Sequence, residues 1–368
     1  MNWGELITLE YGKPVKDKEA TDGKVPVYGT NGQIGTSHLP AQCKHPSFIL
    51  GRKGAYRGVH YSDCPFSVID TAFYAEPLTD RIDLKWAYYK FLTYDINGMD
   101  SGSAIPSTDR YQIYSIEVEV PPLEKQRKIV AVLDCIDRKI NINQKVNDNL
   151  EQQAQAIYHE RFETVSPNDL PSDWRIVTLG EVATISNKSF NPLKEPEILL
   201  EHYSIPAFDE VRFPVFELST AIKSNKFIID ASCFMISKLN PTTKRVWKPY
   251  CLTGNAVCST EFIVYKAKDQ SITDFLYSVI DSGSFSDFMC SHVTGSTGSR
   301  QRTTPSDTLS YELILPSEDE LAEFQSLVSP MYAQMRINAI ENDKLKRLRD
   351  SLLPKLMSGE IDVSSVHL

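Results

Sequence analysis

The chain has 368 residues, of which 41% are hydrophobic and 24% carry a charge. These are the values of an ordinary globular protein, so they exclude a mostly disordered chain and leave room for two or three domains. The net charge of −9 excludes a simple polycation that coats nucleic acid, but it does not exclude a protein with a local basic surface that reads DNA.

We expect neither a membrane span nor export. The sequence has no run of 18 apolar residues, and its first residues lack the basic and apolar regions of a secretory signal. The seven cysteines form no Cys-x-x-Cys pair. An odd, scattered set of this kind predicts reduced, buried thiols in a cytoplasmic protein.

The chain contains an internal repeat of about half its length. Residues 4–8, Gly-Glu-Leu-Ile-Thr, align with residues 180–184, Gly-Glu-Val-Ala-Thr, at an offset of 176 positions. A strand-like run ending in proline closes each copy, at 116–121 and at 311–316, and a long helical stretch follows each at an offset of 195. The second globular half is therefore about 19 residues longer than the first.

Each globular half mixes short strands and helices. Residues 47–50 and 260–265 are apolar or β-branched runs between Gly, Pro and Asn turns, which predicts strands. Residues 84–92 and 272–280 are helical candidates, and Asp83 is placed to cap the first. The fold class is therefore predicted as α+β.

Both long helices carry a seam in which apolar residues alternate at spacings of four and three, the pattern of a coiled coil. Each helix is predicted to run about 40 residues, or roughly 60 Å. Pro330 is expected to kink the second helix or to begin it afresh. The seams are Ile129, Leu133, Ile136, Ile140, Asn143, Asn147, Leu150, Ala154 and Ile157 in the first helix, and Phe324, Val328, Met331, Met335, Asn338, Asn342, Leu345, Arg349 and Leu352 in the second.

Four seam positions are asparagines, at Asn143, Asn147, Asn338 and Asn342. They either set the register of the helix pair or mark a wet, splayed section of it. Pairing the helices with each other would cover both apolar stripes, and the intervening globular half makes an antiparallel pair with one globe near each end the natural arrangement.

The chain is thus divided into two globular parts and two helical parts. The expected parts are 1–121, a first globular domain; 122–165, a central helix; 166–316, a second globular domain; and 317–368, a C-terminal helix.

Several segments in this order resemble the specificity (S) subunit of type I restriction–modification systems. The resemblance covers nearly the whole chain, although the second helix opens with residues 316–320, Pro-Ser-Glu-Asp-Glu, in place of a double proline. The matching segments are Pro121–Val130 and Leu352–Ile361 at the helix ends, Val27–Gly35 and Gly51–Gly54 in the first half, and Ser237–Pro241 and Cys258–Phe262 in the second.

The resemblance implies a non-catalytic subunit that reads an asymmetric, bipartite site on double-stranded DNA. Its helix pair would set the gap between the half-sites and would dock two methyltransferase (M) subunits, which hold S-adenosylmethionine. Restriction (R) subunits, with ATP and Mg, would complete a nuclease. No cofactor, metal or membrane is implied for this chain itself.

Candidate DNA contacts are basic, amide and hydroxyl side chains in Gly-rich or Pro-containing loops, because such groups reach base edges and phosphates. Each cluster can equally be an ordinary polar loop, and the Asn-Gly at 31–32 is also a strong hairpin signal. The candidates are Gln33, Arg52, Lys53, Tyr56, Arg57 and Ser103 in the first half, and Lys238, Asn240, Lys244, Arg245, Ser296, Thr297, Ser299, Arg300, Gln301 and Arg302 in the second.

Two other classes of function remain as alternatives. A self-sufficient restriction or modification enzyme would need a methyltransferase motif, a phosphate loop or a metal site, and Asp83-Leu84-Lys85 with Asp70 imitates a nuclease site only weakly. A coiled-coil adaptor that binds only protein is the other alternative. The Arg- and Gln-bearing loops in both halves favour DNA binding over it.

Overall fold

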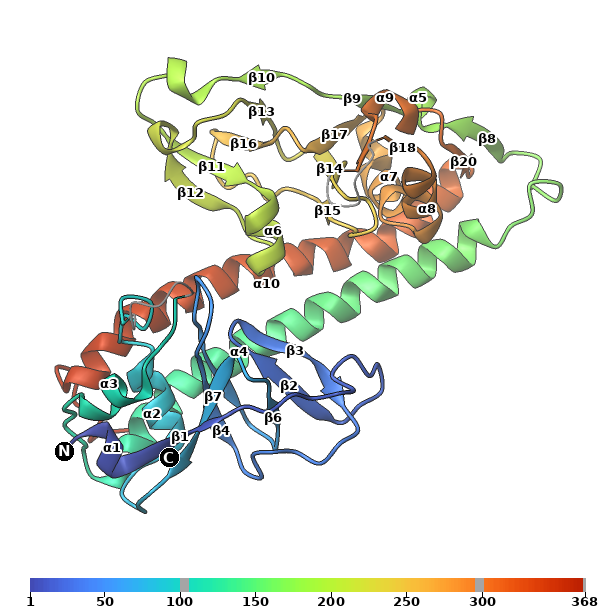
Figure 1. The fold of residues 1–368 in the computed structure, drawn as a ribbon. Coiled ribbons are helices and arrows are strands. Elements are labelled where there is room, and N and C mark those ends of the chain that lie inside the picture. The colour runs from blue at the N-terminus through green and yellow to red at the C-terminus, as the bar shows by residue number, and fades with distance from the viewer. Residues whose placement is uncertain (100–105, 295–300, 367–368) are drawn as a thin grey trace. The chain divides into compact units, whose positions relative to one another are not determined.

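The computed structural model describes residues 1–99, 106–294 and 301–366 (Figure 1). The chain divides into two compact units, and both long helices contribute to each of them. Unit 1 comprises Met1–Lys139 with Leu345–Leu368, and unit 2 comprises Ile140–Lys344. The division between units therefore runs through the helices rather than at their ends. The predicted α+β class with an antiparallel helix pair is confirmed.

Unit 1 is built on the four-stranded antiparallel sheet β1-β7-β4-β5, with a smaller sheet β3-β2-β6 beside it. Asp83 caps helix α2, as predicted: its side chain accepts hydrogen bonds from the backbone amides of Lys85 and Trp86. The elements are α1 (Trp3–Leu6), β1 (Ile7–Tyr11), β2 (Val25–Gly29), β3 (Gly32–Ser37), β4 (Ser47–Gly51), β5 (Val59–Ser62), β6 (Ser67–Val68), β7 (Ala72–Pro77), α2 (Leu84–Phe91) and α3 (Arg110–Ser115).

Unit 2 repeats the first sheet as β9-β17-β14-β15 and adds the five-stranded sheet β10-β13-β16-β11-β12. Its elements up to β14 are β8 (Arg175–Thr178), α5 (Leu179–Val182), β9 (Ala183–Ile185), β10 (Ser189–Phe190), η2 (Pro192–Lys194), β11 (Leu199–Tyr203), α6 (Ile205–Val211), β12 (Val215–Leu218), η3 (Ser219–Ala221), β13 (Lys226–Ile228) and β14 (Cys233–Ser237). The rest are β15 (Val246–Trp247), β16 (Ala256–Ser259), β17 (Phe262–Ala267), η4 (Gln270–Ile272), α7 (Thr273–Ile280), α8 (Gly283–Ser291), β18 (Val293–Thr294), β19 (Arg302–Thr303), α9 (Pro305–Thr308) and β20 (Glu312–Leu315).

The repeat seen in the sequence is a repeat of structure. Helices α1 and α5 both begin with a capping box, formed by Asn2 with Glu5 and by Thr178 with Glu181. Each helix leads into an edge strand of its unit's four-stranded sheet. Each sheet is followed by a helix, α2 or α7, close to the predicted bounds.

One predicted strand is missing in the first copy. Residues 312–315 form β20 by pairing with β8, whereas residues 116–120 make only an isolated bridge between Asn2 and Glu117. In unit 2 the strand β8, just before α5, is the partner of β20. In unit 1 the corresponding contact is the bridge at Asn2 together with the amide of Val118, which donates to Met1 O at 2.8 Å.

The long helices are α4 (Leu123–Tyr158), extended by a π-helical turn η1 (His159–Glu163), and α10 (Glu318–Ser358). Pro330 lies inside α10 and begins no new helix, so of the two predicted effects the fresh start is wrong. Its missing N–H would have bonded the carbonyl of Ser326, and both residues lie on the exposed side, where water can replace that bond. Phe324 and Val328 on the opposite side are fully buried and hold the helix in place.

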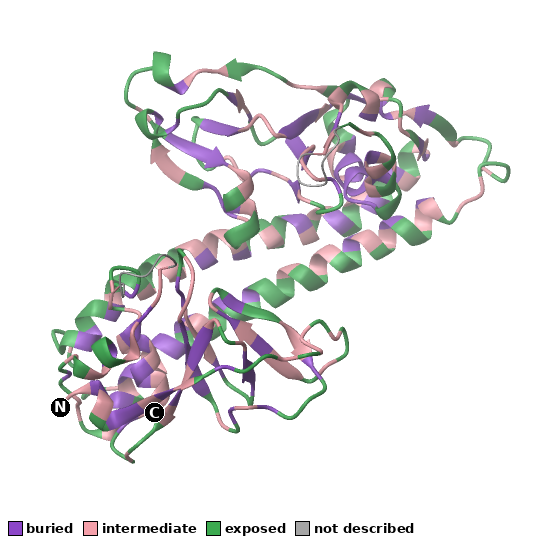
Figure 2. Cartoon of the chain, in the orientation of Figure 1, coloured by how far each residue is buried: buried purple, intermediate pink, exposed green. Residues whose placement is uncertain are grey.

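Figure 2 shows buried residues concentrated on the sheets and recurring along the long helices. Seam positions such as Leu133, Ile140 and Val328 are buried, as the spacing predicts. The cysteines are free, but only Cys43, Cys233 and Cys258 are buried; Cys64 and Cys135 are exposed, so the prediction of uniformly buried thiols is wrong. Within the described ranges, no helix is long and apolar enough to cross a membrane.

Candidate nucleic-acid interface and its supporting helices

Unit 1 brings together two of the loops singled out in the sequence. The segment after β4 and the segment before α3 bridge each other: the amide of Gly54 donates to Pro106 O at 3.0 Å, and the amide of Thr108 donates to Arg52 O at 2.8 Å. Lys53 and Ser107 face each other between these bonds. The candidate residues Arg52 and Lys53 are therefore fixed by main-chain pairing.

Unit 2 builds the same bridge from the equivalent segments. The amide of Asn240 donates to Gln301 O at 2.9 Å, and the amide of Thr303 donates to Lys238 O at 3.1 Å. Leu239 and Arg302 face each other between these bonds. Positions 301 and 303 correspond to 106 and 108 at the offset of 195.

Both bridges contain one residue with a positive φ, Gly54 at 126° and Asn240 at 49°. Gly and Asn are the residues that enter positive φ at least cost, which explains their use at these two positions. The backbone of the interface is thus duplicated, whereas its side chains differ.

Two arginines of unit 1 flank one aromatic ring. The guanidinium carbons of Arg52 and Arg110 each lie 4.7 Å from the centroid of the Tyr11 ring, which is partly exposed. In the part of the chain that the structure describes, no ion pair joins either guanidinium to a carboxylate. Tyr56 and Tyr111 are more than 60% exposed. These cations and rings are available to phosphates and bases.

Sequence reasoning missed Tyr11, Arg110 and Tyr111. The polar segment that it examined ended at Thr108, two residues before Arg110. Tyr11 lies almost 100 residues upstream, at the end of β1, and only the folded sheet brings it to Arg52. The local signal that could have found the cluster is the continuation of the loop into Asp109-Arg110-Tyr111.

The candidate Arg57 does not lie at the surface. Its side chain is 2% exposed and donates from Nη2 to Asn97 O at 2.6 Å, while its amide donates to Asn97 Oδ1. Gln33 is exposed and donates to Gly35 O, and Thr30 and Asn31 form the two-residue hairpin turn that the Asn-Gly signal predicts. Burial therefore separates Arg57 from Tyr56, although the sequence placed both in one cluster.

Two candidate arginines of unit 2 are held by carboxylates. Arg302 forms a bidentate pair with Glu261, with Nε–Oε2 and Nη2–Oε1 distances of 3.0 Å, and Glu261 raises the pKa of the Arg302 guanidinium. Arg245 pairs in the same way with Asp209. These acids neutralise the arginines and fix their orientation.

Lys244 lies beside a buried acid. Its Nζ is 2.8 Å from Asp281 Oδ1 and donates to the backbone carbonyl of Asp281 at 2.7 Å. Burial raises the pKa of Asp281 to about 6 despite this cation. Ser103, Ser296, Thr297, Ser299 and Arg300 lie outside the described residues.

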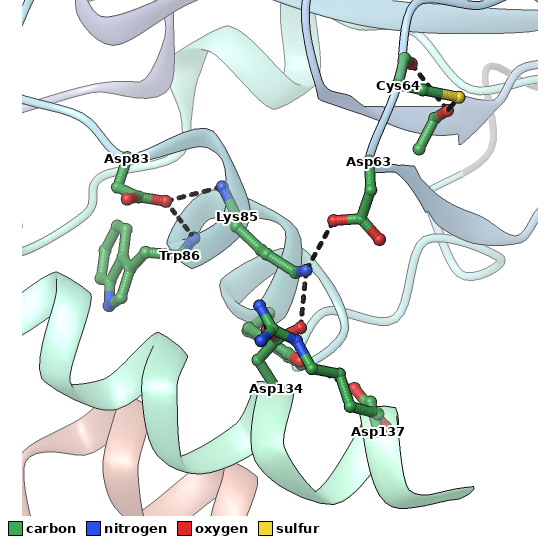
Figure 3. A network of polar contacts seen from close by, with 10 residues as sticks. Asp63, Cys64, Asp83, Lys85, Trp86, Asp134 and Asp137 are labelled. Atoms are coloured by element: carbon green, nitrogen blue, oxygen red, sulfur yellow. Dashed lines mark hydrogen bonds and ion pairs between the residues drawn. The ribbon is translucent and has the colours of Figure 1, made fainter. Parts of the chain in front are cut away.

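The first globular part is fixed to α4 by a polar network (Figure 3). Lys85 Nζ lies 2.8 Å from Asp63 Oδ1 and 2.6 Å from Asp134 Oδ1, so it joins α2 to the helix. Asp137 accepts from Tyr89 at 2.7 Å and from Arg349 of α10 at 2.9 Å. The network connects α2, α4 and α10 within unit 1.

The opening of α4 contains a fully buried glutamine. Gln126 donates from Nε2 to Arg81 O at 2.9 Å and to Pro121 O at 2.8 Å, and its Oε1 accepts from the amide of Asp83 at 2.8 Å. Its amide thus satisfies three backbone groups. This explains why the segment 121–130 requires a glutamine at this position.

The second globular part is fixed to the helices by different residues. Arg212 forms two 2.8 Å hydrogen bonds to Glu151 of α4 and a third to Val246 O. Burial lowers the pKa of the Arg212 guanidinium, but Tyr277, Glu151 and Asp281 together raise it above its ordinary value. Tyr332 of α10 shares a 2.7 Å hydrogen bond with Ser278 of α7.

The four seam asparagines meet at the centre of the helix pair. Asn143 Nδ2 donates to Asn342 Oδ1 at 2.9 Å, and Asn338 Nδ2 donates to Asn147 Oδ1 at 2.8 Å. Asn147 also donates to Met335 O, and Asn342 to Ile140 O.

Each of these bonds maps onto another one when the sequence is shifted by 195. The asparagine cluster is therefore symmetric about a local two-fold axis, and the two helices run antiparallel through it. Because the cluster is hydrogen-bonded, it is not a splayed section of the pair.

Comparison with known proteins agrees with this architecture. Residues 2–152 match the model of the type I restriction modification DNA specificity domain. The chain is 24% identical over 320 residues to the MjaIX specificity subunit of Methanocaldococcus jannaschii, with 78% of this chain and 71% of that protein covered. It is 22% identical to the HindI specificity subunit of Haemophilus influenzae, with 74% of each chain covered.

A solved S subunit from M. genitalium has the same fold, with a TM-score of 0.60 at 16% identity over 97% of this chain and 95% of that one. Over most of its length the chain is therefore similar to the specificity subunits of type I restriction–modification systems. A specificity subunit is the non-catalytic part of such a system, and this similarity implies no cofactor of the chain's own.

Proposed function

We propose that this chain is an S subunit that reads an asymmetric, bipartite site on double-stranded DNA, with residues 1–121 and 166–316 as its two recognition domains. The observation that carries the proposal is the duplicated loop bridge, in which equivalent backbones present different side chains. Arg52, Lys53 and Ser107 in one bridge correspond to Lys238, Leu239 and Arg302 in the other. Two such surfaces would prefer different bases.

Within this proposal the two interfaces act differently. In unit 1, Arg52 and Arg110 flank the Tyr11 ring and form no ion pair with a carboxylate among the described residues. The two cations suit phosphate contact, and the ring suits stacking. Arg302 is oriented by Glu261, as a base-reading arginine needs to be. Substituting Arg302 by Ala should relax the second half-site by about 1–3 kcal/mol and leave the first half-site unchanged. An equal loss on all sequences would make Arg302 a phosphate contact.

The helices, 122–165 and 317–368, are proposed to set the spacer and to dock two M subunits. Ile142 and Ile337 support the docking role: they are 56% and 55% exposed and correspond at the offset of 195. A matched pair of exposed isoleucines suits two copies of one partner. Ile142→Glu and Ile337→Glu should each remove one of two M subunits in a mass measurement of the complex. Retention of both by either variant would exclude these sites.

The M subunits would supply S-adenosylmethionine, and R subunits would add ATP and Mg. The alternative, a coiled-coil adaptor without DNA binding, predicts no sequence-dependent DNA affinity and no steep salt dependence.

The deciding experiment maps methylated adenines at base resolution in cells that carry the cognate M gene, with and without this gene. A split, asymmetric motif that requires this gene is expected. A palindromic motif, or a motif that persists without the gene, would contradict the proposal.

The spacer role has a separate test. Deleting one heptad from α4, residues 123–158, should change the gap between the half-sites and keep both half-sites. An unchanged gap would refute the proposal that the helices set the spacer.

A further inference from the structure

Three side chains of unit 1 with metal-ligand chemistry gather outside the candidate DNA interface. Cys43 and His45 lie in the loop between β3 and β4, and Glu76 lies on β7. Their ligand atoms all fall within 4.8 Å of one another. The Sγ of Cys43 is 3.9 Å from His45 Nε2 and 4.0 Å from Glu76 Oε1, and Nε2 is 2.7 Å from Glu76 Oε2.

We propose that Cys43, His45 and Glu76 bind one zinc ion, which clips the 38–46 loop to the central strand β7. Zinc takes thiolate, imidazole and carboxylate ligands at about 2.3, 2.0–2.1 and 2.0–2.2 Å, so tetrahedral coordination places the ligand atoms roughly 3.3–3.6 Å apart. The two distances from Cys43 Sγ are slightly longer than this tetrahedral spacing, and the distance from His45 Nε2 to Glu76 Oε2 is shorter. The side chains of His45 and Glu76 are 38% and 34% exposed, so they can adjust by small rotations, and water can supply the fourth ligand.

The surroundings of the triad favour this coordination. His45 Nδ1 is 3.0 Å from Pro46 O, and a hydrogen bond donated there leaves the lone pair of Nε2 directed at the other two ligands. A second hydrogen bond of this kind is usual for zinc-bound histidines. Cys43 is fully buried, and its backbone is fixed to Phe66 by two hydrogen bonds of 2.9 and 3.1 Å.

A zinc ion bound between the 38–46 loop and β7 would have a structural role. Among the described residues, the core between β7 and the small sheet β3-β2-β6 is a cluster of five buried residues with the half-buried Tyr28 and Tyr74 packed against it: Cys43, Ile49, Phe66, Val68 and Ala72. A core of this size contributes little stability, and small modules are commonly held by metals or disulfides. A zinc clip between the loop and β7 would close this module. The proposal does not depend on DNA reading.

The competing arrangement is an ordinary hydrogen bond between His45 and Glu76, with the thiol of Cys43 donating to His45 O at 3.3 Å. Cobalt(II) distinguishes the two, because a thiolate ligand produces a charge-transfer band in the near ultraviolet and tetrahedral coordination produces intense visible bands. The experiment titrates cobalt chloride into the untagged, chelator-treated full chain and then displaces it with zinc.

We expect both sets of bands to saturate at one cobalt per chain and to disappear on adding zinc. The charge-transfer band should be lost in Cys43→Ser and kept in the matched control Cys64→Ser, which changes an exposed thiol. His45→Asn and Glu76→Gln should weaken zinc binding at least tenfold, roughly the minimum effect of disturbing a zinc ligand. They also test the site if Cys43→Ser does not fold. Absence of the bands in the unmodified chain, or their persistence in all three variants, would overturn the proposal.

Discussion

The asparagine cluster in the helix seam makes a quantitative prediction. Asn143 is 3% exposed and donates both to Asn342 Oδ1 and to Glu341 Oε2, at 2.9 and 2.7 Å. Asn143→Leu removes both bonds and leaves the buried Oδ1 of Asn342 without this donor. Leaving one buried polar group unsatisfied costs about 1–3 kcal/mol, so we expect a loss of that size in the free energy of unfolding.

Replacing both partners should have a different effect. In Asn143→Leu/Asn342→Leu no polar group of this pair remains in the seam, and two leucines extend the apolar stripe. Such replacements are nearly neutral or stabilising. The double-mutant cycle should therefore give a coupling energy of about 1–3 kcal/mol. The symmetry-related pair Asn147 and Asn338 should show a smaller coupling, because Asn147 is only half-buried.

Urea unfolding of the full chain, with hydrogen exchange of α4 amides 140–158 as a local readout, measures these quantities. Hydrogen exchange is needed because a chain of two units can unfold in more than one step. If each single variant lies within about 0.5 kcal/mol of the unmodified chain, or if the two losses simply add, the asparagines do not act as a hydrogen-bonded pair.

Three further outcomes follow from the contacts described. Gln126→Ala should destabilise unit 1 by about 2–4 kcal/mol in urea unfolding, because three backbone groups lose their partner; a loss below about 1 kcal/mol would contradict this. Arg212→Lys should lose the bidentate pair with Glu151 and speed exchange of amides 140–158, whereas unchanged exchange would mean that the pair does not fix α4. Asp281 has a folded pKa of about 6, above its unfolded value, so its contribution to stability is present at low pH and is lost as pH rises between about 4 and 6. The unmodified chain should lose stability relative to Asp281→Asn across that window, and parallel stability curves would refute the assignment.

The long helices could be predicted from the sequence because their evidence is local and periodic. The alternation of four and three in the seam identifies the buried face, and asparagines at equivalent positions indicate a symmetric contact. The strand proposed at 116–120 could not be checked in this way, because a strand needs a partner elsewhere in the chain. Residues 312–315 find that partner in β8, whereas Glu117 finds only Asn2.

The candidate interface was predictable only in part, for a related reason. Residue type and glycine content identified Arg52 and Arg302, but the acid that orients Arg302 comes from β17 and the ring that Arg52 flanks comes from β1. Burial separates Arg57 from its sequence neighbour Tyr56. Such relations arise from strand order and not from spacing along the chain.

The offset between the two copies indicates where the fold tolerates change. The offset is 176 between α1 and α5, 186 between β4 and β14, and 190 between β7 and β17. It is 195 between residues 106–108 and 301–303, and it stays at 195 from there onward. The extra residues of the second copy therefore lie among the strands and loops that precede residue 301. Residues 106–108 and 301–303 are equally far along the chain from the starts of α4 and α10. If the helices set the spacing, changes in either reading surface would leave that spacing intact. Base preference in each half-site could then vary independently of the other half-site and of the gap between them.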